Sequence, residues 1–544
     1  MKFRKGLLSL LLILAGSFTV LSAQSGGNGS SLLLNSLYVI AAIVFFAIVV
    51  QVSDNLMVIE AKRIGADKSG QNFGLIPRMQ ELFSPRLPEY LEGQQLISSR
   101  KGFDIPLEGA PDARVLDRKV LRFGINAADM RGMAPIPRLQ VEVGDPVKAG
   151  DPLFFDKSQP DLVVTAPVSG EVVEIRRGER RALREIVILA DKKQVYRSFP
   201  KIDLNSVSRE NLVGLLASAG LMPLFRQRPF QILPRLNEIP RDIFVSTFDT
   251  APLAPDAGQA LLGREEAFRV GLRVLGKLTS GRVFLGLDGR GQTPPPPIFS
   301  EAEGVTKTYF RGAHPMGNVG VQIHHLGPIA PEDVVWTIAA QDIAVLGDFI
   351  LRGEVRLIRR IALCGANLKN TGYVDLPLGA SVRELLDGED LSSDRRIISG
   401  DVLTGTKMAG DAFLGFYDDQ LTQVDEGNQY ELFGWLLPTD MRPSMSKTFP
   451  STLLGGVPSA ANTNTRGEKR AFVVTGEYDR LLPMDLLPQQ LFKAILINDV
   501  EKMENLGIHE LVEEDVALCE FGCTSKQPLQ ALLRDGLNSM QAEG

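Results

Sequence analysis

Cysteine, histidine and tryptophan are scarce in this sequence of 544 residues, which has three cysteines, four histidines and two tryptophans. Three cysteines cannot make a disulfide framework, so the bulk of the chain is predicted to suit a reducing compartment. No HxH or HExxH metal pattern and no G-x-S-x-G nucleophile elbow is present. These absences exclude disulfide-stabilised secreted domains and the common zinc and serine hydrolases.

An excess of positive charge is also lacking, since 59 Lys and Arg stand against 65 Asp and Glu, for a net charge of -6. Binding to a phosphate backbone needs a basic surface, so no nucleic-acid partner is expected. Apolar residues make up 44% and charged residues 23%, as in ordinary globular proteins. At ~150 residues per domain, the length predicts three to four domains.

The N-terminus carries the strongest physical signal, because no charged residue occurs between residues 6 and 53. This stretch holds two apolar segments, 7–23 and 32–52, separated by QSGGNGSS. The second segment, at ~1.5 Å per residue, reaches ~30 Å and is predicted to span a membrane. The first fits a transmembrane helix and a cleavable signal peptide equally well. Residues 1–58 are therefore assigned to the membrane.

The charges that flank these segments predict the orientation of the chain. Lys62, Arg63 and Lys68 follow the second apolar segment. Under the positive-inside rule, such a cluster marks the cytoplasmic side of the membrane. We therefore expect the large domain to lie on the cytoplasmic side of the inner membrane.

The rest of the chain divides into five parts by its sequence patterns. These patterns are short strand-like runs, an alternation of helical and strand-like segments, and a helix-forming C-terminal end. The predicted parts are a tether (59–97), an all-β module (98–198), an α/β domain (199–356), a second β-rich domain (357–440) and a helical C-terminal region (441–544). In the α/β part, helical stretches at 209–219 and 265–279 alternate with strand-like runs such as DIFVSTFD and GRVFLGL. This alternation predicts parallel strands.

The first β module has the two-hairpin texture of biotinyl and lipoyl domains, with GDPVKAGDPLFFDK followed by LVVTAPVSGEVVEI. Its glycines and prolines are typical of tight turns between short strands. Lys157 falls near the position that carries the prosthetic group in true lipoyl domains. Its neighbours, FFDKSQPD, lack the usual frame around a modified lysine, so a solvated hairpin lysine is the expected role.

Eight ordered blocks between residues 98 and 544 carry a resemblance to one family. They are KGFDIPLEGAP (101–111), RPF (228–230), FRGAHPMGNVGVQIH (310–324), VWTIAAQD (335–342), SGDVLTGT (399–406), FGW (433–435), YDRLLPMDLLP (478–488) and ALCEFGCTSK (517–526). In these blocks the chain resembles the A subunit of the Na⁺-translocating NADH:quinone oxidoreductase (NQR complex). The N-terminal membrane segments are an addition to the pattern of that family, whose A subunit is usually soluble and peripheral.

The resemblance implies a multidomain fold of the α/β plus β class. After the transmembrane segments, the expected parts are a biotinyl/lipoyl-like barrel-sandwich module, a Rossmann-like α/β domain, a β-grasp (SLBB-like) domain that starts near Arg360, and a C-terminal helical region. The flavin subunit of respiratory complex I and the C subunit of the Rnf electron-transfer complex share these parts.

Residues that those two relatives need for redox chemistry are missing. A flavin site would require a glycine-rich phosphate cradle, and the nearest segment, DGRGQTPPPP at 288–297, has prolines that remove backbone N–H donors. Iron–sulfur clusters take four thiolates each, whereas only Cys519 and Cys523 lie near one another in the sequence, and Cys364 belongs to another domain. No flavin, iron–sulfur cluster or metal is expected in this chain, and both C-terminal cysteines are expected to be buried.

Quinone binding is the one ligand interaction that the resemblance supports for this subunit. A quinone needs an apolar slot and hydrogen-bond donors for its carbonyls, which His314, Trp336 or Gln341 could supply. His324 and His325 are adjacent and are predicted to point to opposite faces of a strand. His509 lies next to acidic residues. No catalytic residue is assigned.

The function that the resemblance implies is a non-redox, quinone-interacting subunit of a membrane complex that oxidises NADH, reduces quinone and pumps Na⁺ from cytoplasm to periplasm. NADH, FAD, FMN and a 2Fe–2S centre would bind to the partner subunits, B to F. Two alternatives are a membrane-anchored adaptor of an efflux pump, which predicts long heptad helices, and an Rnf-type subunit without its clusters. Since neither apolar segment has an ionisable residue, Na⁺ is not expected to pass through this chain.

Overall fold

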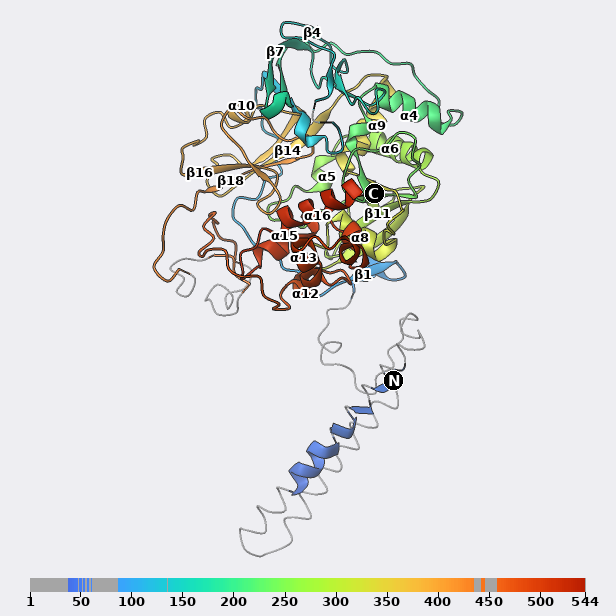
Figure 1. Ribbon diagram of the computed structural model, residues 1–544. Coiled ribbons are helices and arrows are strands. Elements are labelled where there is room, and N and C mark those ends of the chain that lie inside the picture. Colours follow the sequence, from blue (N-terminus) through green and yellow to red (C-terminus); the bar gives the residue numbers. More distant parts are fainter. Residues whose placement is uncertain are drawn as a thin grey trace, which may run out of the picture. The chain divides into compact units, whose positions relative to one another are not determined.

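A computed structural model describes residues 38–46, 48–50, 52, 53, 56, 57, 60, 87–134, 136–434, 442–445 and 457–543 of the chain. The chain divides into two compact units, residues 1–87 and residues 88–544, and each is described here by itself. Figure 1 shows the elements of both units.

Apart from residue 87, the described residues of the first unit are helical, including 38–46 and 48–50. Their apolar side chains are exposed: Phe45 is 70% exposed and Ile40 60%. Among the residues described, we find no helix that is both long and apolar enough to cross a membrane. The predicted segment 7–23 lies outside the described residues, and so do residues 32–37, 47 and 51 of the segment 32–52.

A six-stranded sheet in the order β1-β12-β11-β10-β13-β9 forms the centre of the second unit. Its strands are β1 (Leu96–Ser98), β9 (Phe225–Arg228), β10 (Asp242–Ser246), β11 (Val283–Asp288), β12 (Thr306–Arg311) and β13 (Val335–Ile338). All neighbours pair in parallel except β9 and β13, which are antiparallel. The predicted Rossmann-like α/β layer is confirmed.

Helices cover both faces of this sheet. Consecutive residues of a strand point to opposite sides, so each face of the sheet packs against its own set of helices. Ile243 and Val245 of β10 face the core that contains α6 (Glu265–Leu278) and α9 (Ala340–Arg352). Phe244, between them, faces Ile323 of α8 (Val319–Leu326) in a separate cluster. Three further helices belong to this part, namely α4 (Arg209–Ser218), α5 (Ala257–Ala260) and α7 (Pro297–Ser300).

Two glycines allow α6 and α9 to pack closely. A Cβ atom added to Gly271 of α6 would lie 2.0 Å from the carbonyl oxygen of Ile343 in α9. A Cβ added to Gly347 of α9 would lie 1.7 Å from the carbonyl oxygen of Ala267 in α6. The two backbones therefore touch at positions where only glycine fits.

The barrel-sandwich module consists of two small antiparallel sheets. One contains β2 (Arg122–Asn126), β8 (Leu183–Ala190), β7 (Gly170–Arg177) and β4 (Pro146–Val147), and the other β3 (Arg138–Leu139), β5 (Pro152–Phe155) and β6 (Val163–Thr165). Lys157 is exposed in the turn that follows β5. In Figure 1 this module lies at the top of the second unit, away from the C-terminal helices.

The β-grasp domain holds a five-stranded sheet in the order β15-β14-β18-β16-β17. Its elements are β14 (Ile358–Cys364), β15 (Gly372–Pro377), α10 (Val382–Leu385), β16 (Arg395–Ser399), β17 (Thr406–Lys407) and β18 (Gln420–Asp425). β14 pairs in parallel with β18, and the other pairs are antiparallel.

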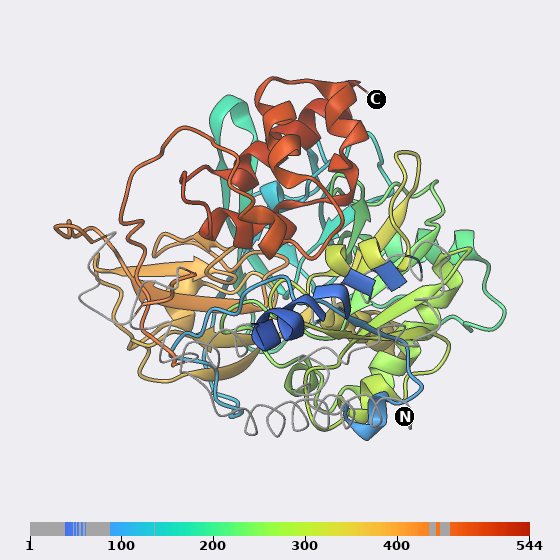
Figure 2. The same cartoon turned by 90° about the horizontal axis from the view of Figure 1, so that it is seen from below.

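The chain ends in five helices, seen together with the β-grasp sheet in Figure 2. They are α12 (Tyr478–Leu481), α13 (Pro488–Leu496), α14 (Val500–Asn505), α15 (Glu513–Phe521) and α16 (Leu529–Glu543). Their shared core also contains Phe310, Met316 and Val321 from the α/β domain. This region is thus packed onto the loop after β12 and onto α8.

Two expectations about local structure were wrong. Residues 96 and 97, predicted as the end of a tether, and residue 98, predicted as the start of the all-β module, form β1 and pair with β12. His324 and His325 lie on α8 rather than on a strand, with ring centroids 5.3 Å apart. His324 contacts Glu510 at 2.8 Å through Nδ1 and accepts the Asp485 amide N–H at 2.9 Å through Nε2. The histidine pair therefore joins α8 to the C-terminal region.

Candidate functional site

The loops that follow the parallel strands meet at the carboxyl edge of the six-stranded sheet. β11 and β13 lie on opposite sides of β10, so the strand order reverses there. In open α/β sheets, ligands bind at such a switch point. The loop after β10 brings Asp249 and Thr250 to this edge, and the loop after β12 brings His314. The fold therefore indicates this edge as a candidate site.

His314 is a buried and neutral member of this edge. Its side chain is 3% exposed, and burial lowers its pKa from 6.5 to about 4. Its Nδ1 atom lies 3.1 Å from the hydroxyl of Thr250, which already accepts the N–H of Gly317 at 3.0 Å. The Thr250 hydroxyl can then donate its own proton to Nδ1 of His314. Because Nδ1 accepts this hydrogen bond, the proton of the neutral ring lies on Nε2. Within the described residues, Nε2 has no hydrogen-bond partner.

Carboxylates outnumber cations around His314. Asp104 accepts the backbone N–H of His314 at 2.8 Å, and Asp401 also lies near the ring. The side chain of Asp249 is in contact with solvent. The surrounding protein atoms nevertheless remove part of its hydration, and together with nearby carboxylates they raise its pKa to about 7. Arg290, from the DGRGQTPPPP segment, pairs with Asp288 at 2.8 Å and is the nearby cation. The edge is therefore polar and acidic.

Gln341 lies at the start of α9, where hydrogen bonds already occupy its amide. It donates to the carbonyl oxygen of Arg360 at 3.0 Å and accepts the Arg360 N–H at 2.8 Å. Beside it, Arg359 and Asp342 form a buried ion pair at 2.6 Å. These contacts join the α/β domain to the β-grasp sheet. The Gln341 amide nitrogen also lies 3.5 Å from the Asp419 carboxylate, so both of its N–H donors have acceptors within the protein.

Trp336 lies within the sheet, on β13, and is fully buried. Its ring packs 5.5 Å from that of Phe225, between centroids, and its indole Nε1 has no hydrogen-bond partner among the described residues. His314 and Gln341 thus lie at the carboxyl edge of the sheet, whereas Trp336 lies inside it. None of the three lines either of the two clefts described below.

All three cysteines are buried and are free thiols. Burial raises the pKa of the Cys364 and Cys519 thiols well above the ordinary range. Cys519 lies on α15, and Cys523, just after that helix, contacts the hydroxyl of Tyr478 at 2.9 Å. Within the part of the chain that the structure describes, no group of three or more His, Cys, Asp or Glu side chains could hold a metal ion.

The larger cleft has a volume of about 1260 Å³ and lies between the β-grasp sheet, residues 460–470 and α15. Its lining includes apolar side chains, such as Ile105, Leu107 and Val402. It also includes cations, among them Arg470 and Lys526. Sequence patterns did not predict this cleft, because its walls come from four distant stretches of the chain.

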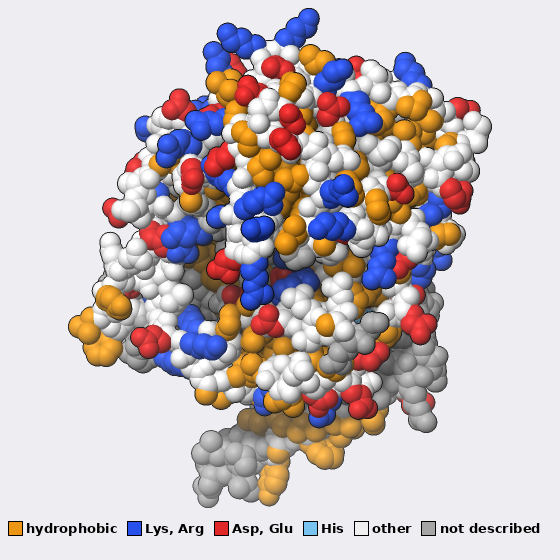
Figure 3. All heavy atoms as spheres, turned by 45° about the horizontal axis from the view of Figure 1, so that its top comes forward, with side chains coloured by type: hydrophobic (Ala, Val, Ile, Leu, Met, Phe, Trp, Pro, Cys, Tyr) orange, Lys and Arg blue, Asp and Glu red, His pale blue; other side chains and the backbone are white. Residues whose placement is uncertain are grey.

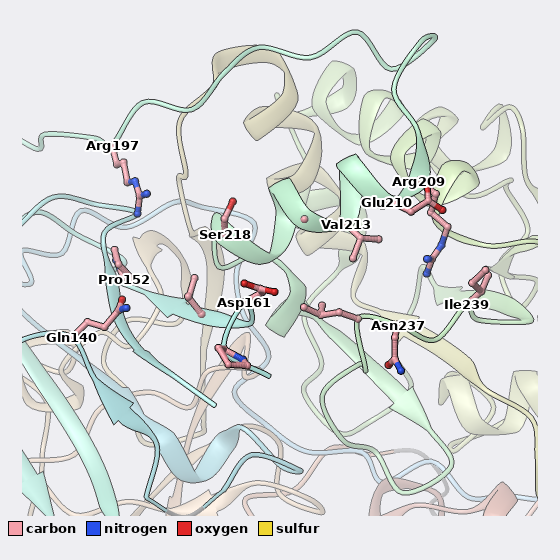
Figure 4. A pocket seen from close by; sticks show the side chains of 14 residues that line it. Gln140, Pro152, Asp161, Arg197, Arg209, Glu210, Val213, Ser218, Asn237 and Ile239 are labelled. Atoms are coloured by element: carbon pink, nitrogen blue, oxygen red, sulfur yellow. The ribbon is translucent and has the colours of Figure 1, made fainter. Parts of the chain in front are cut away.

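A second cleft, of about 670 Å³, lies between the barrel-sandwich module and α4. Figure 4 shows Asp161 and Gln140 from the module on one side and Arg209 and Glu210 of α4 on the other. Arg209 is held in place by the carbonyl oxygens of Leu278 and Glu238, at 2.9 and 2.8 Å. On the face seen in Figure 3, acidic and basic side chains are interspersed.

Three family models match the globular part of the chain in sequence order. The NqrA N-terminal barrel-sandwich hybrid domain matches residues 97–191, the NqrA second alpha/beta domain matches residues 207–355, and the NQRA C-terminal domain matches residues 360–410. Each match falls on the part of the fold with the corresponding architecture. The barrel-sandwich, α/β and SLBB-like expectations are therefore confirmed.

Curated relatives match over nearly their whole length. The A subunit of the Na(+)-translocating NADH-quinone reductase from Saccharophagus degradans is 36% identical over 453 residues, which is 82% of this chain and 100% of the relative. The corresponding subunit from Rhodopirellula baltica is 36% identical over 83% of this chain and 99% of its own.

Among solved structures, an air-oxidised NAD+-reducing [NiFe]-hydrogenase has 14% identity over 41% of this chain and 50% of its own, with a TM-score of 0.30. That value is too low to establish a shared fold. The family models and the curated relatives agree, and the chain belongs to the NqrA family, that of the A subunit of the Na(+)-translocating NADH-quinone reductase.

Proposed function

We propose that this chain is a non-redox, quinone-interacting subunit of a membrane complex that oxidises NADH, reduces quinone and pumps Na⁺ from cytoplasm to periplasm. The observation that carries the proposal is the match to curated relatives of the same complex over their whole length. The catalytic activity belongs to the assembly, a translocase, and this chain contributes docking and quinone exchange. The partners are the other subunits of the complex, B to F.

The redox groups are proposed to lie in those partners, as FAD, FMN and a 2Fe–2S centre, with NADH bound there too. The state of the cysteines supports this division. Reactive or ligating thiols need a lowered pKa and access, whereas burial raises the pKa of Cys364 and Cys519. The prolines at 294–297 support the absence of a flavin cradle, because they leave that segment without backbone donors.

Quinone contact is proposed for the two buried ring nitrogens that lack a partner among the described residues, Nε2 of His314 and Nε1 of Trp336. A buried unsatisfied donor costs ~1–3 kcal/mol, and a quinone carbonyl would remove that cost. Gln341 is the weakest of the three candidates, because Arg360 occupies its amide.

The membrane anchor at the N-terminus remains a proposal. Its support is the row of exposed apolar side chains on helical residues, including Phe45, Ile43 and Val44. No described residue of the same unit packs over these side chains, and the apolar interior of a bilayer would cover them. The proposed location is the inner membrane, with the large domain on the cytoplasmic side.

The adaptor alternative is disfavoured by helix length. It predicts long heptad helices, whereas the longest helices in the described part of the chain, α6 and α16, span 14 and 15 residues. Coiled-coil hairpins need several heptads in each arm.

Affinity purification of the tagged full chain from its own membranes in mild detergent tests the function. We expect the eluate to reduce quinone with NADH, faster with Na⁺, and to contain flavin-bearing partners. An inactive, colourless chain without partners, from an extract that kept the activity, would refute the proposal. An eluate that reduces quinone at a rate independent of Na⁺ would refute the Na⁺ coupling.

A further inference from the structure

Positive charge is concentrated in the larger cleft, between the β-grasp sheet and α15. Among the described residues, seven Lys and Arg side chains line it, against three Glu side chains and no Asp. The chain as a whole has a net charge of -6, so this local excess runs against the balance of the molecule. An excess of one charge in a concave site concentrates ions of the opposite sign.

Part of this positive charge is not neutralised, because one carboxylate next to the cleft is shared by two cations. Glu426 pairs with Arg396 and, at 2.9 Å, with Lys407. Two positive side chains against one negative side chain keep a net positive charge. Arg396 and Lys407 line the cleft from strands β16 and β17 of the β-grasp sheet.

Three further cations have no ion pair within the described residues, namely Arg470, Arg480 and Lys526. Burial lowers the pKa of Lys526, and the nearby guanidinium groups, that of Arg470 included, lower it further. Of the other guanidinium groups near Lys526, those of Arg442 and Arg466 pair with Glu431. Arg470 and Lys526 are thus two like charges near one another with no ion pair among the described residues, a feature that an anion would relieve.

Backbone contacts hold the two segments that carry these cations side by side. The N–H of Arg470 donates to the carbonyl oxygen of Ser525 at 2.9 Å, and the side chain of Gln527 donates to the carbonyl oxygen of Arg470. The Cε atom of Lys526 lies 4.0 Å from the point where a Cβ on Gly467 would be. The charges are thus fixed by the fold rather than carried on separate loops.

Apolar side chains line the same cleft as the cations, with Ile105, Leu107, Val402 and Leu403 among them. The volume of about 1260 Å³ exceeds the ~300–1,000 Å³ of ordinary small-molecule sites. A ligand with an anionic end and a sizeable non-polar part would meet both surfaces.

We propose that this cleft is a binding site for a phosphate group, carried either by a free phosphorylated metabolite or by the headgroup of an anionic phospholipid. A phosphate has up to two negative charges and several acceptor oxygens, which suits guanidinium and ammonium donors that converge from two segments. A single carboxylate would leave most of these donors unused. The site is separate from the residues proposed for quinone, so it does not depend on the proposed function.

Isothermal titration calorimetry on the full chain, in a neutral detergent and phosphate-free buffer, tests this site. The probes are inorganic pyrophosphate, dioctanoyl phosphatidylglycerol and, as a ligand without phosphate, dioctanoylglycerol. The double variant Arg470→Gln/Lys526→Gln is expected to weaken phosphate binding about tenfold or more. The variant Lys192→Gln/Lys193→Gln removes the same charge from exposed residues elsewhere and is expected to bind like the unmodified chain.

Pyrophosphate binding alone would assign the site to free phosphorylated compounds. Tighter binding of phosphatidylglycerol than of pyrophosphate, without binding of dioctanoylglycerol, would assign it to a lipid headgroup. The proposal fails if neither phosphate probe binds, if dioctanoylglycerol binds as well as phosphatidylglycerol, or if both double variants lose binding equally. It also fails if a hexaglutamate peptide binds more tightly than either, since the site would then serve an acidic protein segment. The charge-preserving variant Arg470→Lys/Lys526→Arg should retain binding, which separates loss of charge from loss of fold.

Discussion

Arg228 of β9 donates a hydrogen bond to Asp515 of α15 at 3.4 Å, and both side chains are fully buried. Asp515 also accepts the backbone N–H of Val512 at 3.1 Å and so caps α15. Arg228 belongs to the RPF block and Asp515 lies just before the ALCEFGCTSK block. This contact therefore joins the α/β sheet to the C-terminal helices through two regions that resemble the same family.

Replacing Asp515 by Asn is expected to lower the free energy of unfolding by about 3 kcal/mol, because the buried guanidinium of Arg228 loses its buried charged partner and keeps only the partly exposed Glu514. Chemical denaturation of the full chain in detergent measures this change. Glu514, which also pairs with Arg228 but has a side chain that is 33% exposed, supplies the matched variant. Glu514→Gln should cost less than about 1 kcal/mol. Equal costs for both variants would contradict a special role for the buried pair.

Gly271→Ala is expected to destabilise the protein by about 1–3 kcal/mol, because the new methyl group would meet the Ile343 carbonyl oxygen at 2.0 Å. Gly276, on the same helix, has open space around its Cβ position. Gly276→Ala should instead stabilise the protein by up to about 1 kcal/mol through its higher helix propensity. Thermal unfolding of both variants gives the comparison, and a neutral Gly271→Ala would mean that α6 and α9 can separate.

Stability should fall as the pH drops from about 6.5 to about 4, in part because of His314. Its pKa is lowered to about 4 in the folded state, so the unfolded state binds the proton first. This contribution is complete above the unfolded pKa and is lost as pH falls through that window, by about 3 kcal/mol. In His314→Gln, the fall in unfolding free energy between pH 7 and pH 4.5 should be smaller. An unchanged pH profile would show that His314 is accessible to protons in the native state.

Trp336→Phe removes the indole N–H and keeps most of the ring volume. If Nε1 of Trp336 donates to a quinone carbonyl, the KM for quinone in the assembled complex should rise about tenfold while NADH oxidation by an artificial acceptor is unchanged. If no quinone contacts it, the KM for quinone stays the same. Steady-state kinetics of the assembled complex separates the two cases.

Alanine at both Asn35 and Ser36 should leave Na⁺ transport intact, because neither apolar segment offers an ionisable residue for an ion path. The measurement is ²²Na⁺ uptake into vesicles that contain the assembled complex, driven by NADH. Loss of uptake with electron transfer and assembly preserved would show that Na⁺ passes along this chain.

Patterns within one segment were sufficient to predict much of the fold. The predicted helices 209–219 and 265–279 correspond to α4 and α6 with one residue of difference at the C-terminal end, because each has a continuous apolar face. The strand-like run DIFVSTFD likewise contains β10. Helix α8 was mistaken for a strand, because its eight residues, VGVQIHHL, are rich in β-branched side chains and too few to show a helical period.

Features that depend on distant residues could not be predicted. β1 has only three residues, and its pairing with β12 decides that it is a strand at all. Of the quinone candidates, Gln341 could not be recognised as occupied, because its partner Arg360 lies in the next domain. The cationic cleft arises where Arg470 and Lys526 come together, and neither has unusual neighbours in sequence.

Because β1 precedes the barrel-sandwich module and yet belongs to the sheet that follows it, the module is a loop inserted into the α/β domain. Leu96 finds its partner Tyr309 only after the intervening chain has been made. At ~5–20 residues per second, synthesis of those roughly 200 residues takes tens of seconds. During that time the module can fold as a unit on the ribosome. β1, the edge strand of the α/β sheet, stays unpaired until β12 has been synthesised.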